Sequence, residues 1–355
     1  MKSTPLEEIH AELDAKMIPL FNWKLPANYP GGALAEHLHT KKYCSVSDAG
    51  QYGKIRIAGA GCTNALDKIL VQSVSASKPG TMHSNLLLAQ DGRVVDQLCI
   101  LHMAEDDFFV KTNPAAGALA EETFRKLLPE EIVIQDLSDV IAGIDLLGPC
   151  ARDVLLQTEV PEEDIPQTGC CRTIEIAGIR CIASAGSFYG TDGFELFCSN
   201  DNIIDLWDEL TCIEPVRPCG VLALDSLRIE QGIPGPGGEI KPGANPFECG
   251  FTALLRENAQ REFSGKAALS TNSPARKMLL AELETRQAAR AGCKVMDAEN
   301  KIIGIVTSGA VVPNLDAACA ICLIDADVQT APDMRLLFSP DGENILSGKI
   351  KNMID

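Results

Sequence analysis

Two carboxylates in this chain stand in apolar, strand-like runs, where a charged side chain is uncommon. Asp96 follows two valines, and Glu195 is the lone charge in the run 194–197. A carboxylate on a rigid strand can accept hydrogen bonds from the N–H groups of a ligand or stabilise developing positive charge. For Glu195 the pattern favours such a role over a solvated strand residue. For Asp96 the pattern by itself favours an aspartate at a strand end, bonded to backbone amides.

The cysteines and histidines do not form a metal-binding pattern. The chain has fourteen cysteines and five histidines, and its one C-x-x-C pair is Cys319 and Cys322. This pair lies in the apolar run 317–324, typical of a buried strand, in which residues three apart face opposite sides. A zinc site would need a second ligand pair, and His37 and His39 do not have the i,i+4 spacing of a helical pair. We therefore predict no metal site and reduced, structural cysteines.

The composition excludes several classes of function. The 355 residues carry 49 acidic against 31 basic side chains, a formal charge of -18, which repels nucleic-acid phosphates. No apolar stretch reaches the roughly 18 residues of a membrane span, and the N-terminus lacks the apolar core of a secretory signal. The segment 59–61 lacks the third glycine of a dinucleotide fingerprint, and 235–238 lacks the lysine of a phosphate-binding loop. We expect a cytoplasmic protein without a nucleic-acid or membrane partner.

The elements that must hold the two carboxylates fall into three groups along the chain. The middle group, residues 51–137, alternates helix-like segments with β-prone runs and contains a hairpin with an Asp-Gly turn at 91–92. The expected strands are 51–57, 84–89, 93–101, 108–112 and 132–136, and the expected helices are 64–71 and 116–128. We interpret their order as β-α-β-β-α-β, the ferredoxin-like split βαβ pattern.

The flanking segments form the other two groups. Residues 1–50 and 138–270 mix helices with strands and include the Gly- and Pro-rich stretch 233–245, which has the composition of a functional loop or linker. After 272–274 the pattern becomes all-β. We predict an α+β protein of three domains, the last of them a small β domain at 271–355.

Ordered segments along the chain carry a resemblance to one protein family. They are Thr4–Leu6 with Trp23–Pro26, Ser45–Gly50, Asp91–Leu98, Gly190–Glu195, Arg217–Gly220 with Asp225–Glu230, and Gly304–Gly309 with Pro313–Leu315. Together they span nearly the whole chain, and their order is hard to reach by chance. On these motifs the sequence resembles the glycine cleavage T-proteins, which are aminomethyltransferases.

This resemblance implies a fold and a reaction. The fold is a three-domain cloverleaf with a discontinuous central folate-binding domain at 1–50 plus 138–270, the ferredoxin-like domain at 51–137, and a C-terminal β-barrel domain at 271–355. The reaction is transfer of an aminomethyl group from the lipoyl arm of H-protein to tetrahydrofolate, which yields methylene-tetrahydrofolate and ammonia. The implied co-substrate is tetrahydrofolate, and the implied partner is the lipoyl-bearing H-protein.

The resemblance also assigns residues to the site. Asp96 matches the family's functional aspartate and is the expected catalytic residue, which would orient a folate nitrogen. Glu195 matches its pterin-recognising glutamate. Asn113 matches a pterin-contacting asparagine, although an Asn before Pro is equally a turn former. The other positions expected to contact the folate are Phe188, Ser84 and Arg228, and for Arg228 a structural ion network is the alternative.

Several positions depart from the family pattern and keep other functions open. Asp48 stands where the family has a histidine, Gln97 replaces the second aspartate of its pair, and Leu224 replaces an arginine near the folate tail. These changes leave a tetrahydrofolate-dependent O-, S- or N-demethylase as the alternative. A non-catalytic folate-binding assembly factor ranks third, because residues 245–250 resemble the transferases rather than those factors.

Overall fold

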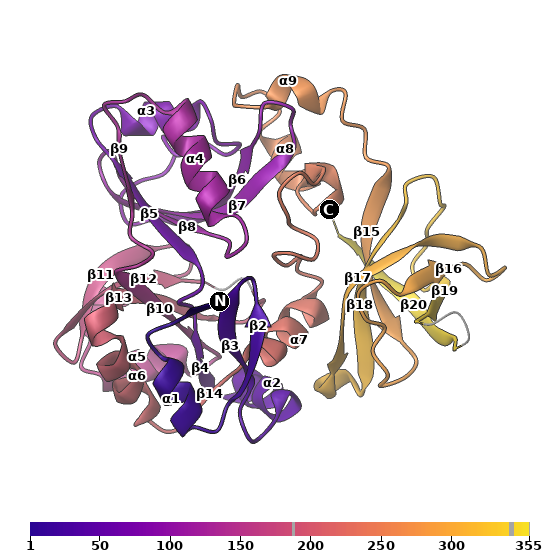
Figure 1. The fold of residues 1–355 in the computed structure, drawn as a ribbon, viewed down its shortest axis with the longest axis horizontal. Coiled ribbons are helices and arrows are strands. Elements are labelled where there is room, and N and C mark those ends of the chain that lie inside the picture. Colours follow the sequence, from indigo (N-terminus) through magenta and orange to yellow (C-terminus); the bar gives the residue numbers. More distant parts are fainter. Residues whose placement is uncertain (187–188, 341–343, 355) are drawn as a thin grey trace.

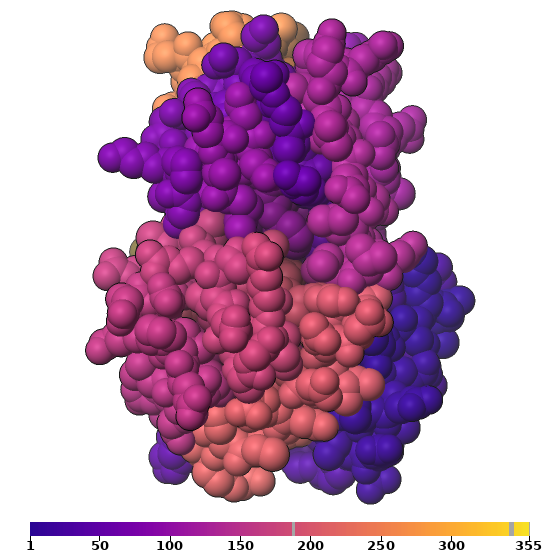
Figure 2. All heavy atoms as spheres, turned by 90° about the vertical axis from the view of Figure 1, so that its left-hand side faces the viewer, coloured from indigo at the N-terminus to yellow at the C-terminus, as the bar shows by residue number. Residues whose placement is uncertain are grey.

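The computed structural model describes residues 1–186, 189–340 and 344–354. Figure 1 shows a barrel of C-terminal strands on one side of the molecule and two sheets, one above the other, on the opposite side. On the face in Figure 2, side chains of the upper unit (purple to magenta) lie directly on those of the lower unit (pink and salmon).

The lower unit is built on a six-stranded sheet with the order β11-β12-β13-β10-β4-β14, in which only the β4–β14 pair is parallel among the described strands. Its strands are β4 (Cys44–Asp48), β10 (Ile141–Leu147), β11 (Cys171–Ile176), β12 (Ile179–Ala185), β13 (Gly193–Ser199) and β14 (Val216–Pro218). Helices α5 (Ala151–Gln157) and α6 (Ile203–Thr211) supply residues to the core on one face of this sheet.

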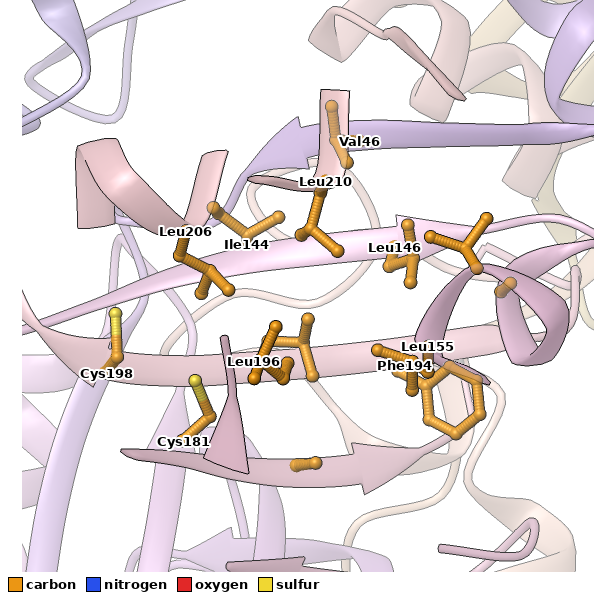
Figure 3. Packing of buried hydrophobic residues seen from close by; sticks show 14 of the residues in the cluster. Val46, Ile144, Leu146, Leu155, Cys181, Phe194, Leu196, Cys198, Leu206 and Leu210 are labelled. Carbon is orange, nitrogen blue, oxygen red and sulfur yellow. The ribbon is translucent and has the colours of Figure 1, made fainter. Parts of the chain in front are cut away.

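The core on that face forms because strand side chains alternate. Val46, Ile144 and Leu196 point toward the helices and pack with Leu155 and Leu206, as Figure 3 shows. All five side chains are fully buried. The residues between them on the same strands must therefore face the other way, toward the upper sheet.

The N-terminal segment and one long helix complete the lower unit. The order β1-β3-β2 makes a small sheet of β1 (Lys2–Ser3), β2 (Lys16–Leu20) and β3 (Trp23–Asn28). The helices are α1 (Glu7–Glu12), α2 (Ala33–Lys42) and α7 (Val221–Gln231), and α7 packs against α2, β3 and the barrel. Helix α7 begins at a close approach, because a Cβ at Gly220 would lie 2.4 Å from the carbonyl oxygen of Ala27.

The upper unit is a five-stranded antiparallel sheet with the order β6-β7-β8-β5-β9. Its elements are β5 (Gly53–Ala58), α3 (Cys62–Asp67), β6 (Met82–Leu88), β7 (Val94–Ala104), β8 (Asp107–Thr112), α4 (Gly117–Leu127) and β9 (Val133–Asp136). Four of the strands, β7-β8-β5-β9, have the split βαβ order that the sequence predicts. The predicted string has one strand too few, because both arms of the Asp-Gly hairpin are strands and β6 extends the sheet at its edge.

The C-terminal residues form a closed six-stranded barrel with the order β15-β18-β17-β16-β19-β20, which confirms the predicted small β-barrel. Its strands are β15 (Arg276–Leu283), β16 (Lys294–Met296), β17 (Ile302–Val312), β18 (Ala317–Asp325), β19 (Arg335–Ser339) and β20 (Leu346–Ile354). On β18, Cys322 lies in the barrel core, whereas Cys319 packs outside it with Ile229 of α7. The two cysteines thus face opposite sides, as strand alternation requires.

Further short helices lie between these elements. They are η1 (Glu162–Asp164), η2 (Asn200–Asn202), η3 (Pro246–Glu248), α8 (Thr252–Glu257), α9 (Lys266–Leu269) and η4 (Pro313–Leu315). Within the described ranges, no helix is long and apolar enough to cross a membrane. The same residues contain no group of three or more His, Cys, Asp or Glu side chains arranged to hold a metal ion. The predicted domain boundaries at 50, 137 and 270 stay predictions.

Candidate active site

A row of polar side chains crosses the face of the six-stranded sheet that is turned away from its apolar core. Ser184, Glu195, Asp145 and Ser47 are direct neighbours on β12, β13, β10 and β4. Each is at most 2% exposed. Burying polar groups is costly unless they are paired, so this row must find partners in what covers it.

Lys111 reaches the row from the upper sheet. On β8, Phe108 and Val110 pack in the core with α4, so Lys111 points the other way, toward the six-stranded sheet. Its Nζ donates a hydrogen bond to Glu195 Oε1 in a buried ion pair. Burial alone would lower the pKa of Lys111, but the charge of Glu195 raises it above its ordinary value. Ser184 Oγ donates to the other oxygen of Glu195 at 3.2 Å.

Asp145 and Ser47 lack such support, because the side-chain oxygens of both have no hydrogen-bond partner among the described residues. Burial, and then the neighbouring charge of Glu195, raise the pKa of Asp145 to about 7, although Lys111 acts in the opposite direction. Tyr189 lies close enough to favour the ionised form of Asp145. It does not meet ordinary hydrogen-bond geometry, because neither oxygen of Asp145 has a hydrogen-bond partner among the described residues.

Two tyrosines cover the row. The hydroxyls of Tyr52 and Tyr189 are 2.9 Å apart and hydrogen-bonded, and either oxygen can be the donor. Lys111 Nζ lies 4.4 Å from the centroid of the Tyr52 ring, within range of a cation–π contact. Burial raises the pKa of both phenols, and for Tyr52 the charge of Lys111 opposes this effect. Both hydroxyls therefore stay protonated at neutral pH.

Three cavities meet around Tyr52, which lines all of them. The innermost, of about 40 Å³, is also lined by Lys111, Gln97 and Tyr189. A second, of about 210 Å³, is mostly apolar and extends over Phe21 to Leu224 on α7. A third, of about 430 Å³, opens over Gln51 and Pro114. Their size together falls within the range of a binding site for a small organic molecule.

The charged side chains that line the inner cavity, among the described residues, are all cationic. Among its described lining residues, the charged side chains are Lys111 and Arg228. Neither Asp96 nor Glu195 lines any of the three cavities. From strand β7, Gln97 and Cys99 line the inner cavity, and Gln97 Nε2 donates to Ser84 Oγ at 3.1 Å.

Asp96 lies on the opposite face of β7 from Gln97. Asp96 is an even number of residues from Leu98 and Ile100 along β7, so its side chain faces the same side of the sheet as theirs. Leu98 and Ile100 belong to the core shared with α3 and α4. Both oxygens accept hydrogen bonds from Asn113, one from the backbone N–H at 2.9 Å and one from Nδ2 at 2.7 Å. Burial raises the pKa of Asp96 to about 8, against the lowering by these bonds. The structure brings Asp96 and Asn113 together, and the catalytic role of Asp96 stays a prediction.

The other predicted residues have distinct surroundings. Asn113 lines two of the cavities, and Arg228 lines two. The guanidinium of Arg228 is held by Asp225, by Glu239 and by Ser308 of the barrel, which is the structural network named as its alternative. Ser84 is exposed on β6. Phe188 lies outside the described residues.

Asp48, which stands where the family has a histidine, belongs to a separate buried network. Thr4 Oγ1 and His10 both hydrogen-bond to its Oδ2, and Gly50 N–H donates to its Oδ1 at 2.7 Å. The Tyr29 hydroxyl lies 3.0 Å from the second nitrogen of His10. This network ties the N-terminal segment to β4, and Asp48 does not line the three cavities.

The comparisons with known proteins agree with this architecture. The sequence profile of the GCVT N-terminal domain family matches residues 6–258. The chain belongs to the glycine cleavage T-protein family. It is 31% identical to the aminomethyltransferase of Saccharopolyspora erythraea, over 92% of this chain and 90% of that protein. It is 30% identical to the aminomethyltransferase of Cutibacterium acnes, over 92% of this chain and 91% of that protein.

A solved structure of the same family has the same fold. The glycine cleavage system aminomethyltransferase T from Bartonella henselae superposes with a TM-score of 0.90 at 26% identity, covering 99% of this chain and 97% of that one. Family membership and the mixed α+β fold with its C-terminal barrel are therefore confirmed. The protein is an enzyme homologue of the aminomethyltransferases.

Sequence reasoning missed Lys111 and Asp145. Each is the lone charge in an apolar strand, Lys111 in 108–112 and Asp145 in 141–147. The same criterion that selected Glu195 would have found both. Neither position lies in the ordered segments that carry the family resemblance.

Proposed function

We propose that this protein is a tetrahydrofolate-dependent one-carbon transferase whose folate occupies the cavities around Tyr52. The observation that carries this proposal is a pair of buried acceptors without partners. Gln51 Oε1 and Thr112 Oγ1 line these cavities and have no hydrogen-bond partner among the described residues. Such atoms are uncommon in native proteins unless a ligand or water completes them. A reduced pterin, which carries several N–H donors, is a ligand of the required kind.

The leading donor is an aminomethyl group on the lipoyl arm of H-protein, which would yield methylene-tetrahydrofolate and ammonia. Support comes from the aminomethyltransferases that are about 30% identical over nine-tenths of this chain. In this proposal Asn113 and Arg228 contact the folate, and Glu195 holds Lys111 beside the pterin; Ser84, which lines none of the three cavities, does not contact a folate placed in them. Asp96 would act by fixing Asn113.

A second donor class is favoured by the charges of the inner cavity. A carboxylate in this cavity would stabilise a positively charged one-carbon unit, but the side chain present there is the neutral amide of Gln97. The charged side chains among the described lining residues are Lys111 and Arg228, and both are cationic. A methyl group on oxygen or sulfur leaves an anion behind, and cationic side chains stabilise an anion. A tetrahydrofolate-dependent O- or S-demethylase is therefore the alternative activity.

The first experiment is a calorimetric titration of the purified protein with tetrahydrofolate. Gln51→Ala should weaken binding by about three- to tenfold, the value of one hydrogen bond. Gln135→Ala, on the exposed side of β9, is the matched control and should bind as the wild type does. A wild-type protein that binds no tetrahydrofolate would exclude both donor classes.

The second experiment separates the donors. Aminomethylated H-protein is mixed with the protein and tetrahydrofolate, and ammonia release is measured. Parallel reactions contain an aryl methyl ether or a methyl thioether, and 5-methyl-tetrahydrofolate is measured. Ammonia release supports the aminomethyl donor, and methyl transfer without ammonia release supports the demethylase.

A further inference from the structure

The cavity of about 210 Å³ has apolar walls from two segments that are far apart in the chain. One wall comes from the end of β2 and the turn after it, and the other from the first turn of α7. The apolar side chains of these two walls are Ile18, Leu20, Phe21, Val221, Leu222 and Leu224. Walls of this kind favour an uncharged ring over water or an ionised group.

Two charged side chains line this cavity among the described residues, Asp225 and Arg228, and they are paired with each other. Arg228 Nη2 lies 2.7 Å from Asp225 Oδ1, and Arg228 Nε donates to the same oxygen at 2.9 Å. Nη1 donates to the Ile233 carbonyl oxygen at 3.0 Å and to Glu239 at 3.2 Å, and Nη2 donates to Ser308 Oγ at 2.8 Å. The guanidinium is therefore engaged at all three nitrogens, and two carboxylates share its charge.

The chain after α7 keeps this guanidinium in place. A Cβ at Gly235 would lie 2.5 Å from Arg228 Cζ, so the backbone passes directly against the guanidinium. The Glu239 side chain is fully buried, and the oxygen that binds Arg228 also accepts from Gly235 N–H at 2.8 Å. If Arg228 turned toward a carboxylate of a ligand, it would leave Glu239 buried without its cation, which is costly.

The neighbouring cavity of about 430 Å³ is no better suited to an anion. The charged side chains among its described lining residues are Lys2, Glu121 and Asp136, so carboxylates outnumber the cation. Lys2 Nζ lies 3.7 Å from Asp139 Oδ1, and its side chain is 59% exposed. A solvated lysine attracts an anion weakly, and like charges repel. Lys111 lines the inner cavity and neither of these two.

A reduced folate has three parts: a pterin with N–H donors, an uncharged aminobenzoyl ring, and a glutamate with two carboxylates. We propose that the cavity over α7 takes the aminobenzoyl ring and leaves the glutamate in solvent. The site then binds reduced pteroyl compounds whatever the number of their glutamates. This inference rests on the proposed function and names its substrate class. Leu222 and Leu224 determine the specificity, because a cation on their wall would attract the glutamate.

The first test is a calorimetric titration of the wild type with four probes. They are 6-methyl-tetrahydropterin, the methylamide of tetrahydropteroate, and tetrahydrofolate with one and with three glutamates. The methylamide keeps the ring and lacks the glutamate, so it should bind about tenfold or more tightly than 6-methyl-tetrahydropterin. Both folates should bind within about twofold of the methylamide, because their carboxylates find no partner.

The outcomes of this titration are distinct. If tetrahydrofolate binds more than about tenfold more tightly than the methylamide, the glutamate is recognised and the inference is wrong. Equal binding of 6-methyl-tetrahydropterin and the methylamide would also overturn it, since the ring would then contribute nothing. If none of the four probes binds, the proposed function itself fails.

The second test changes the α7 wall at Leu222, which is 42% exposed and so can be replaced without disturbing the core. Leu222→Ala should weaken the methylamide and tetrahydrofolate alike by about threefold and leave 6-methyl-tetrahydropterin unchanged. Leu222→Arg should make tetrahydrofolate bind about two- to fivefold more tightly than the methylamide, and added salt should reduce this preference.

Ile204→Arg is the matched control, because Ile204 on α6 is 38% exposed and lines none of the three cavities. It should bind all four probes as the wild type does. A Leu222→Arg protein that binds tetrahydrofolate and the methylamide equally would show that the glutamate does not pass this wall, which contradicts the inference.

Discussion

Lys111 and Glu195 form a buried ion pair between strands of two different sheets, β8 above and β13 below. Their side chains are 4% and 3% exposed. The pair joins the two units at the level of the inner cavity, and it fixes which of the facing side chains a ligand can reach. Glu195, which the sequence predicts as a ligand-binding residue, is reached only beyond Lys111.

Removing one partner of this pair should destabilise the protein more than removing both. Lys111→Met leaves Glu195 buried without its cation, and the free energy of unfolding should fall by about 3–5 kcal/mol. The double variant Lys111→Met with Glu195→Gln keeps neither charge of the pair and should recover most of that loss. Urea unfolding of the two single variants and the double variant measures the coupling. Simple addition of the two single effects would contradict a direct pair.

Asp96 and Asn113 should act together on folate binding. If Asp96 acts by fixing Asn113, Asp96→Asn and Asn113→Ala should both raise KM for tetrahydrofolate, and the double variant should be no worse than either single one. The catalytic role predicted from the family motif requires a different result. In that case Asp96→Asn lowers kcat strongly with little change in KM, and Asn113→Ala does not reproduce it. Steady-state kinetics with varied folate distinguishes the two.

Glu230 on α7 should make the stability of the contact between α7 and the barrel depend on pH. Burial opposes ionisation of Glu230, but the proximity of His37, whose Nε2 lies 3.2 Å from its Oε2, and hydrogen bonds from Lys41 and Asn314 outweigh it and lower its pKa to about 2. A carboxyl with a lowered pKa stabilises the fold above its unfolded value of about 4.5, and this contribution is lost as the pH falls from there toward 2.

The test compares Glu230→Gln with the wild type by urea unfolding at pH 7 and at pH 3. At pH 7 the variant should be less stable by about 1–3 kcal/mol, the value of hydrogen bonds to a charged group. At pH 3 the difference should shrink. A difference that stays constant with pH would show that the network does not depend on the charge of Glu230.

Gly309 should be intolerant of any side chain. A Cβ at this position would lie 1.8 Å from the carbonyl oxygen of Ala289, inside the barrel wall. Because the clash is with backbone, Gly309→Ala should cost about 3 kcal/mol or more in stability. Gly31→Ala is the matched control, since its nearest contact would be the Ala35 Cβ at 3.9 Å, and it should be nearly neutral. Equal thermal unfolding of both variants would contradict the clash.

The sequence could predict the elements whose signal is local. The Asp-Gly hairpin, the β-prone C-terminal runs and the opposite facing of Cys319 and Cys322 follow from turn chemistry and from the period of two in a strand. The family also follows from sequence, because its motifs depend on residue type and order. The predicted number of strands in residues 51–137 was wrong only because the β-α-β-β-α-β pattern left out one arm of the Asp-Gly hairpin.

The sequence could not predict which face of each strand meets which neighbour. Asp96 and Gln97 are adjacent in the chain, and only the packing of α3 and α4 on one side of β7 turns the first away from the cavity and the second into it. A shift of one residue exchanges the two faces of a strand. A motif match at positions 96 and 97 therefore does not determine which of the two side chains faces the cavity.

From the sequence alone come the family, the barrel and the candidates Asp96, Asn113 and Glu195. The stacking of the two sheets decides the rest: it places Lys111 against Glu195 and brings Tyr52 and Tyr189 beside Asp145. These residues are far apart in the chain and their contacts are made through side chains. Their partners depend on how whole sheets pack, and no local pattern of residues encodes that.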